Sequence, residues 1–232
     1  MTMTDTAPTR IAADLPSSGA SGWGAWLLTL SPLGFVAVVV SMVSTLIGAG
    51  IGAFDTITRK QMDSIAFGWA VVNMLFSLAI MIGTIGTALL ASCLARRGGV
   101  ARVPGWTSVA TATASVVTLL PYAPLRIAAA GFSEGTLGQN ALYALWEIPF
   151  DVSRYLMLAS LALLCVSRWL ATSHRASAVV IGALTLVVAI CYAAGLELPP
   201  FIASLLWCAL GIVWLRAVRR RPLPGTGQRA EP

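Results

Sequence analysis

Charged residues are scarce in this sequence, and their scarcity limits its class. Only 10% of the 232 residues are Asp, Glu, Lys or Arg, against about 25% in an ordinary soluble domain, and 57% are hydrophobic. A water-soluble fold cannot bury so large an apolar fraction. The apolar residues also form runs that suit a bilayer, which takes about 20 helical residues to cross. The sequence therefore predicts an all-α, polytopic membrane helical bundle.

The sequence also has few residues that bind metals or cofactors. His174 is the only histidine, which excludes bis-histidine haem and multi-histidine metal sites. The four cysteines contain no CxxC pair, so neither a disulfide framework nor a metal site is indicated. HExxH, a Gly-rich phosphate loop and an Asp-rich DxxxD run are absent, which argues against zinc-protease, ATPase and prenyl-transfer functions. We expect no cofactor and no bound metal.

Lysine is almost absent, and the basic residues are nearly all arginine. The formal charge of +6 would suggest nucleic acid in a soluble protein. Here, however, the arginines lie at the ends of apolar runs, where they orient the chain during insertion, so we predict no nucleic-acid partner. The abundance of alanine and arginine suggests a GC-rich bacterial genome.

Six transmembrane spans are predicted from the apolar stretches. Their approximate ranges are 33–54, 66–94, 106–121, 155–166, 178–195 and 201–215. A short interfacial segment at 23–32 carries two tryptophans, which favour the headgroup level. We expect residues 1–22 to be a disordered polar tail, 23–218 the transmembrane domain, and 219–232 a basic disordered tail.

An even number of spans places both termini on one side of the membrane. Eleven of the fifteen basic residues fall on that side, and only Arg59, Lys60, Arg126 and Arg154 fall on the other. The positive-inside rule therefore predicts that both termini are cytoplasmic and that the protein resides in the inner membrane of the cell.

Two helical faces carry small or hydroxyl side chains. The first comprises Ser44, Gly48 and Gly52, which recur every four residues and allow another helix to approach closely. The second comprises Ser108, Thr111, Ser115 and Thr118. We expect both faces to serve helix packing; docking of a partner helix on the first and lining of a polar cavity by the second are the alternatives.

The polar centre of the chain lies between Asn140 and Trp169. Glu147, Asp151 and Arg154 are spaced by four and three residues, so they share one face of a helix, in which Pro149 favours a bend. Ionisable groups near hydrocarbon are costly and usually paired, which makes each a functional hypothesis. The candidate ligand-binding residues are Arg126, Asn140, Trp146, Glu147, Asp151 and Arg154. A structural clamp is the alternative, in which Arg154 pairs with Asp151 and Arg126 reaches Glu147.

Asn140, Trp146 and Glu147 partly resemble the Asn and Trp-Glu elements of the integral-membrane terpene cyclases. In that family a membrane carboxylic acid protonates an isoprenoid. The likeness covers only these residues, lies in the fourth span rather than an early one, and has no late-helix aspartate beside it. It identifies no family.

Three functions are consistent with these residues. The first is binding or translocation of a small or lipophilic molecule, alone or as the membrane subunit of a transport complex whose ATPase partner supplies energy. The second is a membrane enzyme acting on an isoprenoid or lipid, with Glu147 or Asp151 as the catalytic acid beside aromatic side chains. The third is a structural assembly factor. The predicted partners are the bilayer, a lipophilic small molecule and a membrane or ATPase protein.

Overall fold

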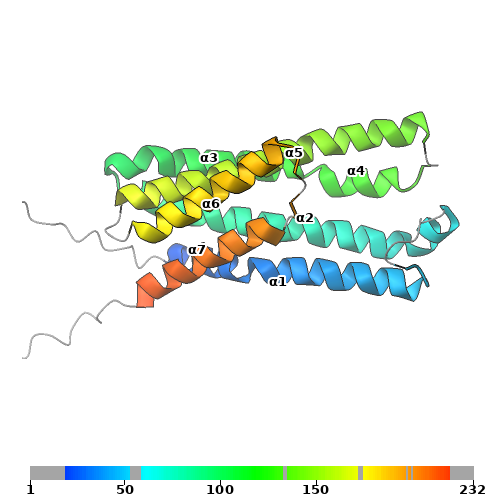
Figure 1. Cartoon of the computed structure of the whole chain (residues 1–232), viewed down its shortest axis with the longest axis horizontal. Helices are drawn as coiled ribbons and strands as arrows, with labels where there is room; N and C mark the ends of the chain where they lie inside the picture. Colours follow the sequence, from blue (N-terminus) through cyan, green and yellow to red (C-terminus); the bar gives the residue numbers. More distant parts are fainter. Residues whose placement is uncertain are drawn as a thin grey trace, which may run out of the picture.

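The computed structural model describes residues 19–52, 59–132, 135–171, 175–196, 198–199 and 201–219. These residues form helices joined by short connections, and no strand occurs among them (Figure 1). The helices are α1 (Gly19–Gly48), α2 (Arg59–Ala95), the 3₁₀ turn η1 (Gly99–Ala101), α3 (Arg102–Leu119), α4 (Tyr122–Ala129), α5 (Leu137–Ala171), α6 (Ala176–Ala193) and α7 (Phe201–Arg219).

Six apolar spans are found in the described part of the chain, as predicted. α1, α2, α5, α6 and α7 each form one, and η1, α3 and α4 together form the remaining one. All six are long and apolar enough to cross a membrane. The start of α1 and the end of α7 lie at the same end of the bundle (Figure 1), as an even number of crossings requires. The chain is therefore compatible with a multi-pass integral membrane protein.

α1 is one continuous helix, which corrects two predicted boundaries. The expected interfacial segment at 23–32 is the first half of α1, and residues 19–22 of the predicted tail are helical. Pro32 lies inside the helix and cannot donate a backbone hydrogen bond to the Leu28 carbonyl. The Ser31 hydroxyl donates to that carbonyl instead, at 2.8 Å, so the helix continues past the proline.

The C-terminal end of α1 lies earlier than predicted. The helix ends at Gly48, not near residue 54. Gly50 has a φ of +67°, and the amides of Gly50 and Ile51 donate to the carbonyls of Ile47 and Leu46, at 2.9 Å each. This is the Schellman pattern, which favours glycine at the left-handed position. Gly52 therefore lies beyond the helix, and the small-residue face of α1 is shorter than expected.

Part of the stretch between the third and fourth predicted spans is helical. α5 begins at Leu137 and continues through Pro149 to Ala171, a length of 35 residues. The fourth span is therefore much longer than the apolar run at 155–166 that predicted it. α7 likewise includes Arg219, the first residue of the expected C-terminal tail.

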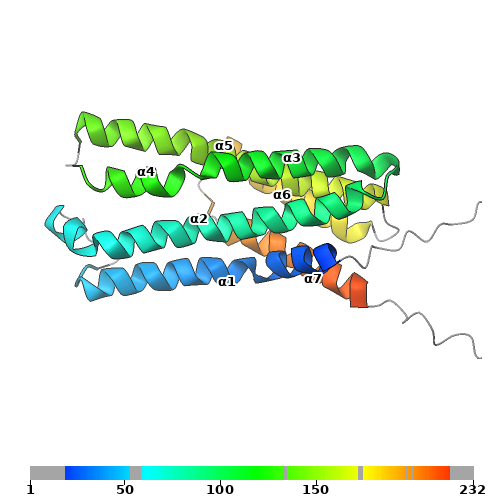
Figure 2. The ribbon, with the colours of Figure 1, turned by 180° about the vertical axis from the view of Figure 1, so that it is seen from behind.

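The α6–α7 hairpin is shorter than the helices around it. α6 and α7 have 18 and 19 residues, about 27 and 28 Å, whereas α5 and α2 have 35 and 37, about 52 and 55 Å at 1.5 Å per residue. The hairpin turn therefore lies near the middle of the bundle's long axis, level with the junction of α3 and α4 (Figures 1 and 2). In the described part of the chain, α1, α2, α4 and α5 continue beyond the turn (Figure 1). We call this part, formed by the C-terminal end of α1, the N-terminal ends of α2 and α5, and α4, the four-helix extension.

The turn of the hairpin is fixed by its own sequence. Gly195 has a φ of +78°, and the amides of Gly195 and Leu196 donate to the carbonyls of Tyr192 and Cys191, at 3.0 and 2.9 Å. A Schellman motif thus ends α6. The Tyr192 hydroxyl donates to the Leu198 carbonyl at 3.0 Å and holds the connection to α7 against the end of α6.

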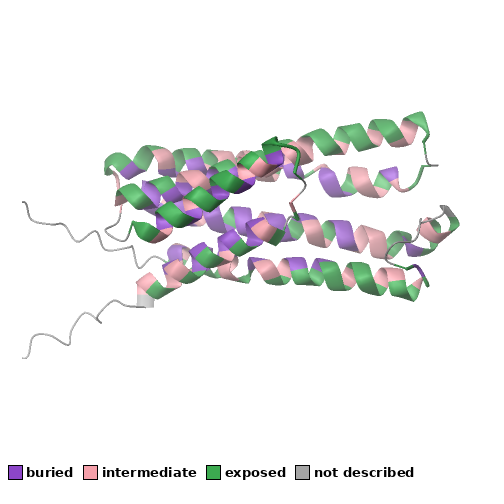
Figure 3. Cartoon of the chain, viewed as in Figure 1, coloured by how far each residue is buried: buried purple, intermediate pink, exposed green. Residues whose placement is uncertain are grey.

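Exposed apolar surface is extensive, as a membrane bundle requires. Large apolar side chains are exposed along α1, from Trp23, which is 70% exposed, to Ile47, also 70% exposed. Exposed residues follow this helix along the outside of the bundle, whereas buried residues gather between helices (Figure 3).

The hydroxyl face of α3 serves helix packing, as expected. The Ser108 hydroxyl donates to the Ser160 carbonyl of α5 at 2.7 Å. Ser115 and Ser153 exchange bonds in both directions, each hydroxyl reaching the other's carbonyl at 2.8 and 2.9 Å. Thr111 and Thr118, by contrast, bond to carbonyls of their own helix. The serines therefore join α3 to α5, and the threonines do not.

Replacing Ser115 with alanine should destabilise the bundle. The change removes the interhelical bonds of a fully buried hydroxyl, each worth about 0.6 kcal/mol on average in a membrane bundle, so we expect a total loss of about 1 kcal/mol. The measurement is equilibrium unfolding in mixed micelles. Thr113→Ala is the matched control because its exposed hydroxyl bonds only to Val109 of the same helix. Equal stability of S115A and T113A would contradict the role of the serines.

Glycines allow α7 to lie close to α2 and α1. A Cβ atom at Gly83 of α2 would come within 2.2 Å of the Trp207 ring of α7. One at Gly211 would lie 2.5 Å from the Thr29 hydroxyl of α1. Because Trp207 is fully buried, its ring has little space into which to move.

Gly83→Ala should therefore displace Trp207 and reduce stability by about 1–3 kcal/mol, the usual cost of overpacking. Gly48→Ala is the control, since nothing lies within 4 Å of its Cβ position. Both proteins would be compared by thermal unfolding in detergent. A G83A protein as stable as G48A would show that the contact between α2 and α7 is looser than described.

Candidate functional site

Asp151 and Arg154 form an ion pair on α5. Arg154 Nη2 lies 2.8 Å from Asp151 Oδ1, which confirms the predicted contact. The side chains are 22% and 44% exposed for Arg154 and Asp151, so the pair lies at the edge of the bundle. The Arg154 guanidinium also lies 4.2 Å from the centre of the Tyr192 ring. The pair thus connects α5 to the end of α6, at the hairpin turn.

Arg126 of α4 lies among aromatic rings and does not pair with Glu147, so that predicted contact is wrong. Its guanidinium carbon is 4.9 Å from the Trp146 ring centre, 5.3 Å from that of Trp69 and 5.6 Å from that of Tyr122. Nη1 donates a hydrogen bond to the Tyr122 hydroxyl. Cation–π contacts of this kind take the place of the expected carboxylate.

Aromatic side chains connect Arg126 with Arg154. The rings of Tyr122 and Trp146 are 5.4 Å apart, and those of Tyr122 and Phe150 are 4.9 Å apart. The Arg154 guanidinium lies 5.9 Å from the Phe150 ring centre. The two arginines therefore lie at opposite ends of one continuous aromatic surface built by α4 and α5.

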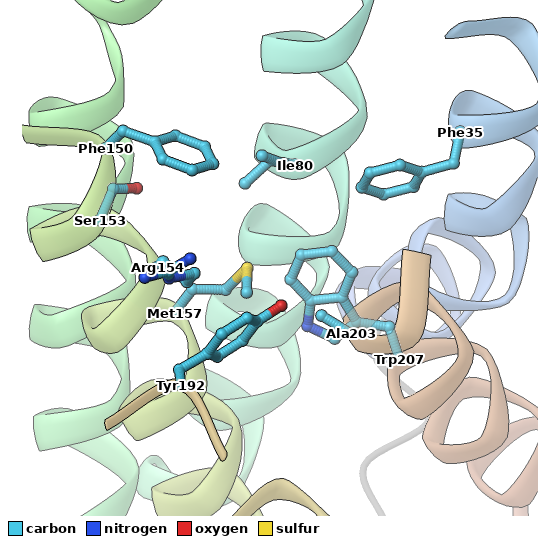
Figure 4. Close-up of a pocket in the computed structure, with 9 residues that line it drawn as sticks. All are labelled: Phe35, Ile80, Phe150, Ser153, Arg154, Met157, Tyr192, Ala203 and Trp207. Carbon is cyan, nitrogen blue, oxygen red and sulfur yellow. The ribbon is translucent and has the colours of Figure 1, made fainter. Parts of the chain in front are cut away.

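A crevice opens beside this surface, between the C-terminal end of α6 and the N-terminal end of α7. Its empty space is about 410 Å³ when the part open to the surroundings is counted, and its cavity volume is about 30 Å³, so the crevice is narrow. The residues that line it come from five helices (Figure 4): Phe35, Ile80, Phe150, Ser153, Arg154, Met157, Tyr192, Ala203 and Trp207. Most of these side chains are apolar, and Arg154 is the charged one. Such a lining suits an apolar ligand with a polar group placed at the edge.

The site residues predicted from the sequence lie in different parts of the structure. Arg154 lines the crevice, Asp151 is paired with it, and Trp146 contacts Arg126. Glu147 is exposed and has no ion pair in the described part of the chain. Asn140 is exposed in the four-helix extension, about 21 Å along α5 from Arg154 at 1.5 Å per residue. The structure does not bring Asn140 to the crevice.

Most lining residues of the crevice were not predicted. Phe35, Ile80 and Trp207 are ordinary apolar residues of three different spans, and only the packing of the helices brings them together. The lone signal was Trp207, because a large aromatic residue inside a span, away from both interfaces, is unusual. Its indole Nε1 is buried and has no hydrogen-bond partner in the described structure.

His174, Glu134, Glu197 and Asp55 lie outside the described residues. Residues 131–135, GFSEG, have the GxSxG spacing of a hydrolase nucleophile, but the elements on either side are helices, whereas that motif needs a strand before its turn. Among the described residues, no group of three His, Cys, Asp or Glu side chains could hold a metal ion.

Comparison with known proteins gives no assignment: no family model, no curated protein and no solved structure matches this chain.

Proposed function

We propose that this chain is an integral membrane protein that binds a small lipophilic molecule in the crevice at the α6–α7 turn. The observation that carries the proposal is the lining of the crevice, which is apolar and aromatic except for Ser153 and Arg154. Ligand sites commonly combine such a lining with a few polar groups that orient the ligand. A lipid-facing bundle also gives an apolar molecule direct access from the membrane.

The enzyme hypothesis receives less support. It needs a carboxylic acid that stays protonated because apolar side chains exclude water from it. Glu147 is exposed, and Asp151 is partly exposed and paired with Arg154. We therefore favour binding over catalysis. The carrier, transport-subunit and assembly hypotheses remain predictions.

Filling the crevice should displace its ligand. Ala203 lines the crevice and is 2% exposed, so Ala203→Phe places a ring in the empty space. We expect the wild-type protein, extracted gently from its own membrane, to retain a bound lipophilic molecule in native mass spectrometry, and the A203F protein to lose it. Ala209→Phe on the exposed side of the same helix is the matched control and should retain it. Equal retention by A203F and A209F would refute the crevice as the site.

We further propose that both termini are cytoplasmic in a bacterial inner membrane, which the excess of arginine near the termini supports. In a variant whose four native cysteines are replaced by alanine, Gly227→Cys should react with a membrane-impermeant maleimide only after the cells are permeabilised. Asp55→Cys, on the predicted outer side, should react in intact cells. The reverse pattern would show the opposite orientation.

A further inference from the structure

Three hydrogen-bond donors around Arg126 have no acceptor. They are Arg126 Nε, Trp69 Nε1 and Trp146 Nε1, and all three atoms are buried. They come from α4, α2 and α5, and the guanidinium lies against both indole rings. Buried donors in native structures nearly always find an acceptor, so three orphans in one cluster need an explanation.

The described protein supplies no negative charge to this cluster. Arg126 has no carboxylate within 4 Å among the described residues, and its only hydrogen bond is the one to Tyr122. Aromatic faces stabilise the cation but do not accept conventional hydrogen bonds from its N–H groups. Arg154 is different, because Asp151 neutralises it. Arg126 therefore keeps its full charge for an external partner.

The location of Arg126 indicates where that partner comes from. α4 begins immediately after the α3–α4 junction, level with the hairpin turn (Figure 1). The Tyr122 ring lies against Arg126 on one side and 4.9 Å from Phe150, which lines the crevice, on the other. The donor cluster and the apolar site thus share one aromatic surface, with the Tyr122 and Phe150 rings between Arg126 and the crevice.

We propose that Arg126, Trp69 and Trp146 bind the anionic head of an amphiphile, a phosphate or carboxylate group, while its apolar tail occupies the crevice. This deepens the proposed function and rests on it for the position of the tail. Phosphate and carboxylate oxygens are acceptors that arginine recognises with charge-assisted hydrogen bonds. Small side-chain rotations on binding bring the two indole N–H groups onto the same oxygens.

Each indole N–H group gives its own signal in a ¹H–¹⁵N NMR spectrum, so the two tryptophans of this cluster can be followed individually. The full chain, labelled with ¹⁵N-tryptophan in a neutral maltoside micelle, has eight tryptophans and so should give eight indole signals. Trp69→Phe and Trp146→Phe assign the two signals of interest. Trp106, 44% exposed on α3 away from the cluster, serves as the internal control. The probes are dodecyl phosphate, dodecanol and inorganic phosphate.

Dodecyl phosphate should move the indole protons of Trp69 and Trp146 downfield in a saturable way, because each gains an acceptor, and should leave Trp106 unchanged. Dodecanol should not produce these shifts. Arg126→Gln should weaken dodecyl phosphate binding about tenfold or more, the effect of losing a charge-assisted hydrogen bond. Arg126→Lys should weaken it less, since the charge remains. Arg102→Gln, an exposed arginine on α3, is the charge-matched control.

Several results would overturn the proposal. One is the absence of any shift at Trp69 and Trp146 with saturating dodecyl phosphate, in a protein whose other signals show that it is folded. Another is an equal affinity in R126Q and wild type. Equally tight binding of inorganic phosphate and dodecyl phosphate would show a site for a free anion and refute the amphiphile.

Ala203→Phe separates this inference from the proposed function. If the tail lies in the crevice, A203F weakens the binding of dodecyl phosphate but not the weaker binding of inorganic phosphate at Arg126. If A203F binds dodecyl phosphate as wild type does, while R126Q does not, the head site is supported and the crevice is refuted as the tail site. If A203F loses the molecule retained from the membrane while R126Q keeps it, the crevice stands and the anionic head is refuted.

Discussion

The difference in length between the α6–α7 hairpin and its neighbours is the constraint on which the site depends. Gly195 ends α6 with a Schellman motif after 18 residues, which is about the thickness of the hydrocarbon core at 1.5 Å per residue. α2 and α5 are about twice as long and continue past the turn. Side chains of α1, α2 and α5 at that level are therefore left without full cover, and the crevice forms there. A hairpin one or two turns longer would close it.

The two arginines near the turn show two ways of holding a cation beside apolar side chains. Arg154 has a carboxylate three residues away on its own helix and the Tyr192 ring above it. Arg126 has three aromatic rings and one hydroxyl. The first arrangement is neutral, although Arg154 Nε, like Arg126 Nε, is buried without an acceptor. The second leaves net charge and donors for a further partner, so Arg126 and not Arg154 is the stronger attractor for an anion.

Sequence patterns predicted those features that depend on the average hydropathy of a segment or on residue spacing within one helix. Hydropathy predicted the six spans, and the spacing of Asp151 and Arg154 predicted their ion pair. The predicted pairing of Arg126 with Glu147 is wrong because aromatic rings from three helices surround the guanidinium and take the place of a carboxylate. A proline in the sequence likewise does not tell whether a helix ends there. At Pro32 the Ser31 hydroxyl takes over the free carbonyl and α1 continues, whereas Pro121 lies between α3 and α4.

The crevice also lies between two groups of helices, α1 with α7 and α5 with α6, which α2 joins. α7 packs on α1, where glycines allow close approach, whereas α6 packs on α5. The hairpin therefore belongs to both groups, and its turn is the place where they diverge. A ligand in the crevice would contact Trp207 from one group and Tyr192 and Arg154 from the other. Because a molecule that binds only the assembled site stabilises it by mass action, occupancy would hold the two groups together at a point where the chain itself supplies few contacts.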